Sequence, residues 1–195
     1  MWPWGHLAFG YLLYSIGHRL STDRPPDQIA VISLITATQV PDLVDKPLAY
    51  WFGVLPGGRT LAHSMLFVVP AAVVMIWASD RYFERRYGIA GAVGLLSHPL
   101  ADAIPLVLNG SWSRLTFLLW PITPAPDYRA SGFGFHLLQL LETVRQKSLR
   151  EIMLNQPEFF GLEIWLVIGV TLLWLYDGAP PLRYLIKGKA GSPPK

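Results

Sequence analysis

The chain has 195 residues, of which 52% are hydrophobic and only 15% are charged, and it contains 8 Trp and no Cys. Its mean hydropathy of +0.34 is too high for an ordinary soluble domain of this length. The absence of cysteine excludes disulfides, thiolate zinc ligands and cysteine nucleophiles. The net charge of +3 does not indicate nucleic-acid binding, because the basic residues are scattered at the ends of apolar segments.

Five apolar segments follow one another along the chain. The first two, residues 4–20 and 28–40, are short for a ~30 Å hydrocarbon core at ~1.5 Å per residue, so they are expected to form a short or re-entrant hairpin. The other three have spanning length and cover residues 61–79, 88–108 and 159–178. These segments predict an all-α, polytopic membrane bundle.

One further helix is predicted at the membrane surface. Residues 135–154 alternate apolar side chains with charged ones, which is typical of an amphipathic helix that lies in the interface. The fold class is therefore a helical membrane bundle of about five apolar helices plus one amphipathic surface helix. Residues 1–187 are expected to form a single integral membrane domain, and residues 188–195 a disordered tail.

Lysine and arginine in the short connections predict the orientation in the membrane. Basic side chains occur within residues 19–24, 81–86 and 183–195. Under the positive-inside rule these three regions, including the basic tail, are cytoplasmic. The amino terminus and the loop expected over residues 41–60 then lie on the non-cytoplasmic side.

Ionisable side chains gather near the non-cytoplasmic end of the predicted bundle. His98 and Asp102 are four residues apart, hence on one face of an apolar helix, where ionisable groups are costly unless paired, hydrated or bound to metal. His63 begins the third segment at a similar depth. The other members of this set are His6, Asp42, Asp45 and Glu163. Imidazole combined with carboxylate suits Zn²⁺, Mn²⁺ or Fe²⁺, so the set predicts a metal site with His63 as a ligand.

Simpler interpretations exist for the same residues. His6 and His63 could mark the membrane interface, Asp42 and Asp45 could belong to a helix-ending turn, and Arg59 could be a flanking cation rather than a phosphate contact. The whole set could also be a buried hydrogen-bond network without metal, or part of a metal-conducting path. The inner halves of the third and fifth segments carry almost no polar residues, which disfavours transport.

Four motifs resemble those of the YdjM-like family of membrane-bound, metal-dependent hydrolases. They are the early "WGH", "PDLVD", "GRTLAHSML" and "SHPLADA", all within residues 4–106, and "FGLEIWL" is a looser match. The stretch from "PDLVD" to "LAHS" is particularly similar to archaeal members, although Ala62 stands where many members have Thr. The family is in turn similar to zinc-dependent phospholipases C and single-strand nucleases.

The resemblance implies a set of roles. The implied metal ligands are His6, Asp42, His63, His98 and Asp102. The implied metal is divalent, with zinc first and manganese or iron as alternatives, and it would lower the pKa of a bound water toward ~7. We therefore expect metal-activated water to attack an ester, with a phosphodiester of a membrane lipid or another membrane-accessible substrate favoured. Asp45 or Glu163 is expected as the general base, and Arg59 is expected to orient the phosphate.

Overall fold

A computed structural model describes residues 1–126, 142, 145 and 160–182. No strand occurs among these residues, so the predicted all-α class is confirmed for the described part of the chain. The α-helices are α1 (Pro3–Thr22), α2 (Gln28–Tyr50), α3 (Met65–Tyr82), α4 (Arg85–Leu108) and α7 (Phe160–Tyr176). Two short 3-10 helices flank the α3–α4 pair along the chain, with η1 (Leu61–His63) before α3 and η2 (Trp112–Leu119) after α4.

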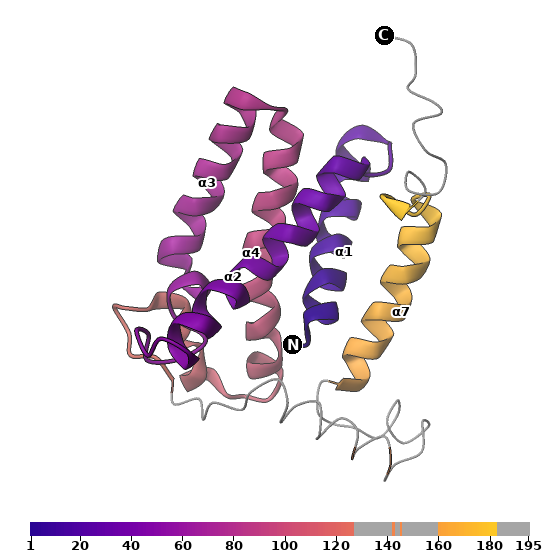
Figure 1. Ribbon diagram of the computed structural model, residues 1–195. Coiled ribbons are helices and arrows are strands. Elements are labelled where there is room, and N and C mark those ends of the chain that lie inside the picture. Colours follow the sequence, from indigo (N-terminus) through magenta and orange to yellow (C-terminus); the bar gives the residue numbers. More distant parts are fainter. Residues whose placement is uncertain (127–141, 143–144, 146–159, 183–195) are drawn as a thin grey trace.

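Helix α4 lies at the centre of the bundle. It packs against α1, α2 and α3, while α7 packs against α1 on the side away from α3 (Figure 1). One buried apolar cluster joins α1, α2, α4 and α7 around Tyr11, Val31 and Leu34. A second cluster joins α2, α3 and α4 around Val68 and Leu95. The two apolar clusters together place α4 between the two halves of the bundle.

Capping residues set the helix boundaries. Pro3 occupies the first turn of α1, where its missing N–H leaves no hydrogen bond unmade. Asp27 caps α2 by accepting hydrogen bonds from the N–H groups of Ile29 and Ala30, at 3.0 and 3.1 Å. The hydroxyl of Ser64 similarly accepts from the first turn of α3. These caps fix where each helix begins and therefore which residues face the centre of the bundle.

Gly94 determines how α4 meets α2. A Cβ atom at this position would lie 2.5 Å from the carbonyl oxygen of Leu34, so only glycine allows the two helices to approach this closely. Residues one turn later on both helices then also face each other, and His98 Nδ1 lies 2.6 Å from the carbonyl oxygen of Thr38. The glycine contact thus sets the register that brings His98 toward Asp42.

Two of the described helices, α3 and α4, are long and apolar enough to cross a membrane by length and composition, and α7 is a shorter apolar helix. Exposed apolar side chains cover the outward faces of α3 and α7, as at Val73, Trp77, Leu172 and Leu175, which are 55–63% exposed. Helices α1 and α2 do not meet the same criterion. The prediction of five apolar helices is therefore met for helix formation and only in part for spanning.

Helix α2 is longer than predicted. It continues through Pro41 and Pro47 to Tyr50, so the loop expected over residues 41–60 begins ten residues later than expected. The predicted boundary was wrong because a proline removes one helix hydrogen bond without ending a helix that its neighbours support. Asp42 and Asp45 therefore project from a helix. Helices α1 and α2 have 20 and 23 residues and are thus longer than the apolar segments predicted over 4–20 and 28–40.

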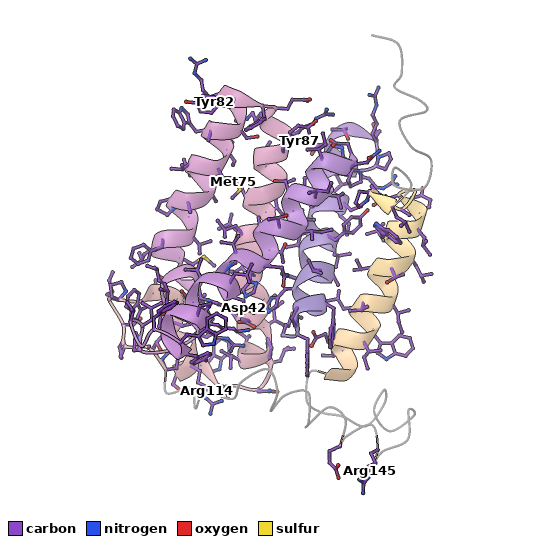
Figure 2. All side chains as sticks on the ribbon, viewed as in Figure 1. Asp42, Met75, Tyr82, Tyr87, Arg114 and Arg145 are labelled. Atoms are coloured by element: carbon purple, nitrogen blue, oxygen red, sulfur yellow. The ribbon has the colours of Figure 1, made fainter. Side chains whose placement is uncertain are left out.

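The third apolar helix also begins later than predicted. His63 lies in η1, and α3 begins only at Met65, so the third apolar helix starts four residues later than expected. The turn between α1 and α2 and the turn between α3 and α4 lie at one end of the bundle, while Asp42 lies toward the other end (Figures 1 and 2). The surface helix expected over residues 135–154, apart from Glu142 and Arg145, and the tail over 188–195 lie outside the described residues.

Candidate metal centre

Three histidines and two aspartates from four elements converge near the end of the bundle that holds the amino terminus. They are His6 from α1, Asp42 from α2, His63 from η1, and His98 and Asp102 from α4. Four of the five side chains are at most 2% exposed, and that of Asp42 is 15% exposed. The side chains form two groups, and within each group the possible ligand atoms all lie within 4.8 Å of one another. His98 belongs to both groups.

The first group is Asp42, His63 and His98. Oδ1 of Asp42 lies 3.5 Å from Nε2 of His63 and 3.6 Å from Nε2 of His98. Neither of these buried nitrogens has a hydrogen-bond partner among the described residues. The other oxygen of Asp42 binds Lys46, one turn further along α2. Because unpaired buried polar atoms are costly and uncommon, two of them facing one carboxylate oxygen fit a cation held between the three side chains.

An oxygen atom at Nδ1 orients each of the two imidazole rings, those of His63 and His98. Nδ1 of His98 donates to the carbonyl of Thr38, which leaves the lone pair of its Nε2 facing the group. Nδ1 of His63 lies 2.8 Å from Oδ2 of Asp45 in the same arrangement. Histidine ligands in metal proteins are oriented in this way by a carbonyl or a carboxylate on the second ring nitrogen.

Asp45 is fully buried and each of its oxygens is engaged. Oδ1 accepts a hydrogen bond from the N–H of Ala62 at 2.9 Å, and Oδ2 accepts from the N–H of Thr60 at 2.8 Å as well as facing His63. Burial lowers the pKa of His63, but the neighbouring carboxylates of Asp42, Asp45 and Asp102 outweigh this effect, so its pKa is raised above the usual value. Asp45 therefore holds both the η1 segment and the His63 ring.

The second group is His6, His98 and Asp102. Nε2 of His6 lies 3.4 Å from Oδ1 of Asp102, and the His6 ring stacks on that of His98 at 3.7 Å between centroids. Asp102 also receives Arg59, whose Nε lies 2.7 Å from Oδ2 and whose Nη2 lies 3.0 Å from Oδ1. The amino group of Met1 lies 2.7 Å from the same Oδ1. Positive groups thus already neutralise Asp102, whereas the Asp42 group keeps two unpaired nitrogens.

Glu163 lies outside both groups. It is 1% exposed, as buried as expected, but Oε1 accepts a hydrogen bond from the backbone N–H of Trp2 at 2.8 Å. The side chain of Arg59 is 26% exposed, so it extends from Asp102 toward the surface. The structure therefore brings the five predicted ligands together and places Asp45, Glu163 and Arg59 around them in different roles.

Two contributors to the site were not predicted from the sequence. Phe117 of η2 is fully buried, and its ring meets the edge of His63 at 6.3 Å between centroids. Thr38 contributes a backbone carbonyl, which any residue type would supply, so no sequence signal could have indicated it. Phe117 lies in η2, where the sequence predicted no helix, so its burial was not predicted.

The family described as YdjM inner membrane protein matches residues 1–179. The chain belongs to this family. The resemblance predicted from four motifs is thus confirmed, and the match extends beyond residues 4–106 to include α7 and Glu163. No curated protein and no solved structure matches the chain. Membership in the YdjM family makes the chain a membrane protein, in keeping with the apolar helices α3 and α4.

Proposed function

We propose that this YdjM family protein is a membrane-embedded, metal-dependent hydrolase that cleaves an ester bond. The observation that carries the proposal is the pair of buried Nε2 atoms, one from His63 and one from His98, that face the same oxygen of Asp42 without a hydrogen-bond partner among the described residues. Two imidazoles and a carboxylate suit Zn²⁺, with Mn²⁺ and Fe²⁺ as alternatives. A metal bound there would lower the pKa of a water ligand and polarise the ester.

The chain prepares these donors before any metal binds. The carbonyl of Thr38 and the carboxylate of Asp45 hold the two rings so that each offers Nε2 to the centre. His6 and Asp102 lie beside the Asp42 group and would complete the ligand set, because His98 is within 4.8 Å of ligand atoms in both groups. The five side chains would then surround a divalent metal, with Asp42 as the most exposed of them.

Arg59 favours a phosphodiester as the substrate. Its guanidinium is held at the edge of the centre by Asp102, and part of the side chain remains exposed. A planar guanidinium recognises phosphate through paired hydrogen bonds. The loop after α2 presents Trp51, Phe52 and Val54, which are 68–81% exposed and suit the interfacial region of a bilayer. We therefore favour a lipid phosphodiester or another membrane-accessible phosphodiester.

Asp45 and Glu163 are better suited to positioning than to proton transfer. Both oxygens of Asp45 accept backbone N–H groups, and Glu163 binds the backbone of Trp2. A buried carboxylate that holds backbone donors is fixed in place by them and is not free to approach a water. We therefore propose that these two residues orient the centre and that neither acts as the general base.

The centre is proposed to face the non-cytoplasmic side. The α1–α2 and α3–α4 turns lie at the opposite end of the bundle from Asp42 (Figures 1 and 2). Arg24 belongs to the first of these turns and Arg81 to the end of α3 just before the second, and basic residues at such positions favour the cytoplasm.

The competing function is a buried polar network that binds no metal. The contacts of Asp102 favour it, because Arg59 and the amino group of Met1 already compensate this carboxylate. The Asp42 group distinguishes the two functions, since a network without metal leaves two buried nitrogens unpaired.

Metal content tests the proposal. Detergent-purified protein should contain about one zinc-class ion per chain by elemental analysis. The double variant His63→Ala/His98→Ala should lose it while keeping its helical circular dichroism. His18→Ala is the matched control, because His18 lies at the far end of α1 against Tyr14. A parent protein without metal, even after incubation with zinc, manganese and iron, would contradict the proposal.

Activity is tested next, with the same three proteins. Release of nitrophenol from a bis(nitrophenyl) phosphate and of headgroup from phospholipid vesicles should depend on metal and be lost in the double variant. Metal binding without hydrolysis of these esters would favour a non-catalytic metal protein.

A further inference from the structure

Helix α1 receives its N-terminal cap from another helix. In a capping box, a glutamate at the third helical position accepts a hydrogen bond from the backbone N–H of the capping residue. In α1 the capping residue is Trp2 and the third position is Gly5, which has no side chain. The N–H of Trp2 instead donates to Oε1 of Glu163, at 2.8 Å. Glu163 of α7 thus performs from a distant part of the chain the role of a local glutamate.

Gly5 makes room for this contact. A Cβ atom at position 5 would lie 2.1 Å from Oε1 and 2.6 Å from Cδ of Glu163, so the carboxylate fills the space that a side chain there would take. The amide of Gly5 also interacts with this carboxylate. A negative charge at a helix N-terminus is stabilised by the helix dipole as well. Gly5 and Glu163 therefore form a matched pair at the start of α1.

His6 follows Gly5 directly and depends on the position of this turn. Oxygen atoms hold the Nδ1 atoms of His63 and His98, but Nδ1 of His6 is buried and has no hydrogen-bond partner among the described residues. Its ring is located by stacking on His98 and by the backbone that carries it. A shift of the first turn of α1 would therefore move His6 relative to Asp102.

We infer that Glu163 is a positioning residue of the metal centre, which fixes the first turn of α1 and thereby holds His6 against His98 and Asp102. The inference rests on the proposed function. Through Glu163, helix α7 would affect the geometry of the centre although it contributes no ligand to it.

Asp177 provides a matched control at the other end of α7. Its carboxylate also joins α7 to α1, because it accepts hydrogen bonds from the hydroxyls of Tyr11 and Ser15 and from the guanidinium of Arg19. Ser15 lies nine residues after His6, about 14 Å along the helix axis. A loss of α7 docking alone would therefore follow from changes at either carboxylate, whereas loss of His6 positioning would follow only from changes at Glu163.

The experiment measures the metal affinity of the full chain in detergent, by competition with a chromophoric chelator, together with the visible spectrum of the Co²⁺ form. Glu163→Leu and Gly5→Ala should each weaken binding by about 10–100-fold and change the Co²⁺ spectrum. Glu163→Gln keeps an acceptor oxygen and should stay close to the parent. Asp177→Asn should lower the melting temperature and leave affinity and spectrum unchanged. In a His6→Ala background, Glu163→Leu should cause no further loss of affinity.

Separate outcomes overturn the two proposals. A parent protein that binds neither Zn²⁺ nor Co²⁺ overturns the proposed function. If the parent binds metal, parent-like affinity and spectrum in both Glu163→Leu and Gly5→Ala overturn the inference about Glu163. An equal loss in Asp177→Asn, or a further loss in the His6→Ala background, overturns it as well. Glu163→Gln and Gly5→Ala keep the test decisive should Glu163→Leu not fold.

Discussion

Nδ1 of His63 lies 2.8 Å from Oδ2 of Asp45, and both side chains are completely buried. Asp45 belongs to α2 and His63 to η1, so the contact joins the connection between α2 and α3 to the helix before it. The same carboxylate accepts the N–H groups of Thr60 and Ala62. One residue thus determines both the fold of this turn and the direction of a proposed ligand.

Asp45→Asn should therefore weaken metal binding and stability together. The amide keeps the size of the side chain but can accept at only one of its two terminal atoms, so one buried N–H loses its partner. We expect the metal affinity to fall by about 10–100-fold and the free energy of unfolding to fall by about 1–3 kcal/mol. Chelator competition and thermal unfolding measure the two effects. Asp80→Asn, at an exposed position of α3, is the control that should change neither.

The ligands on α4 could be predicted because their positions follow from helix periodicity. His98 and Asp102 are one turn apart within an apolar segment, and that spacing alone places them on one face. Asp42 and Asp45 were predicted by residue type but assigned to a loop, because the apolar segment over 28–40 stops just before Pro41. Neighbouring helices stabilise α2 beyond this proline, and such tertiary support leaves no local signal.

The role of Glu163 could not be predicted for a different reason. Its burial follows from its place in an apolar segment, but its partner is the backbone N–H of Trp2, far away in the sequence. A backbone donor has no residue type. The glycine at position 5 indicates a close approach only once the approaching helix is known. Contacts between side chains and distant backbone groups are therefore the part of this site that sequence patterns do not contain.

Gly94→Val should separate α4 from α2. Because a Cβ atom at position 94 would lie 2.5 Å from the carbonyl oxygen of Leu34, the helices must move apart. Overpacking of this kind costs about 1–3 kcal/mol, and the contact of His98 with the Thr38 carbonyl should be lost with it. Thermal unfolding should show a lower melting temperature, and metal content should fall.

Gly17→Ala is the control for Gly94→Val. No atom of the described residues lies within 4 Å of a Cβ placed at Gly17 in α1, and alanine favours a helix over glycine by ~0.5–1 kcal/mol. This variant should be as stable as the parent or more so. A loss of stability in Gly17→Ala equal to that in Gly94→Val would contradict the proposed role of the glycine contact.

Asp177→Asn should loosen α7 from α1 without affecting the metal centre. The carboxylate accepts from Tyr11, Ser15 and Arg19 in a buried position, and hydrogen bonds to a charged group contribute about 1.5–3 kcal/mol each before solvent screening at the partly exposed Arg19. We expect a lower melting temperature and faster proteolysis near α7. Metal content by elemental analysis should stay at the parent level, and its loss would show that α7 docking as a whole maintains the centre.

Metal removal should destabilise the parent protein. A ligand that binds only the folded state stabilises it by about 2.7 kcal/mol at one hundred times its dissociation constant. A chelator should therefore lower the melting temperature of the purified protein, and added zinc should restore it. The His63→Ala/His98→Ala variant should show no such shift. An equal response in both proteins would place the metal at some other site.

Arg59→Gln should separate metal binding from substrate binding. The guanidinium contacts Asp102 at 2.7 and 3.0 Å, so its removal relieves one competitor for that carboxylate, and metal content should be retained. The same change removes the proposed phosphate contact, so kcat/KM for a phosphodiester should fall by about 10–100-fold, the equivalent of ~1.5–3 kcal/mol. An uncharged carboxylic ester should show a much smaller loss, because it presents no anion to the guanidinium.

Arg114→Gln is the control for Arg59→Gln. It removes an exposed arginine at the same end of the molecule (Figure 2) and should leave the hydrolysis of both substrates unaffected. Equal losses for the two substrates in Arg59→Gln would assign Arg59 to the support of Asp102 rather than to the substrate.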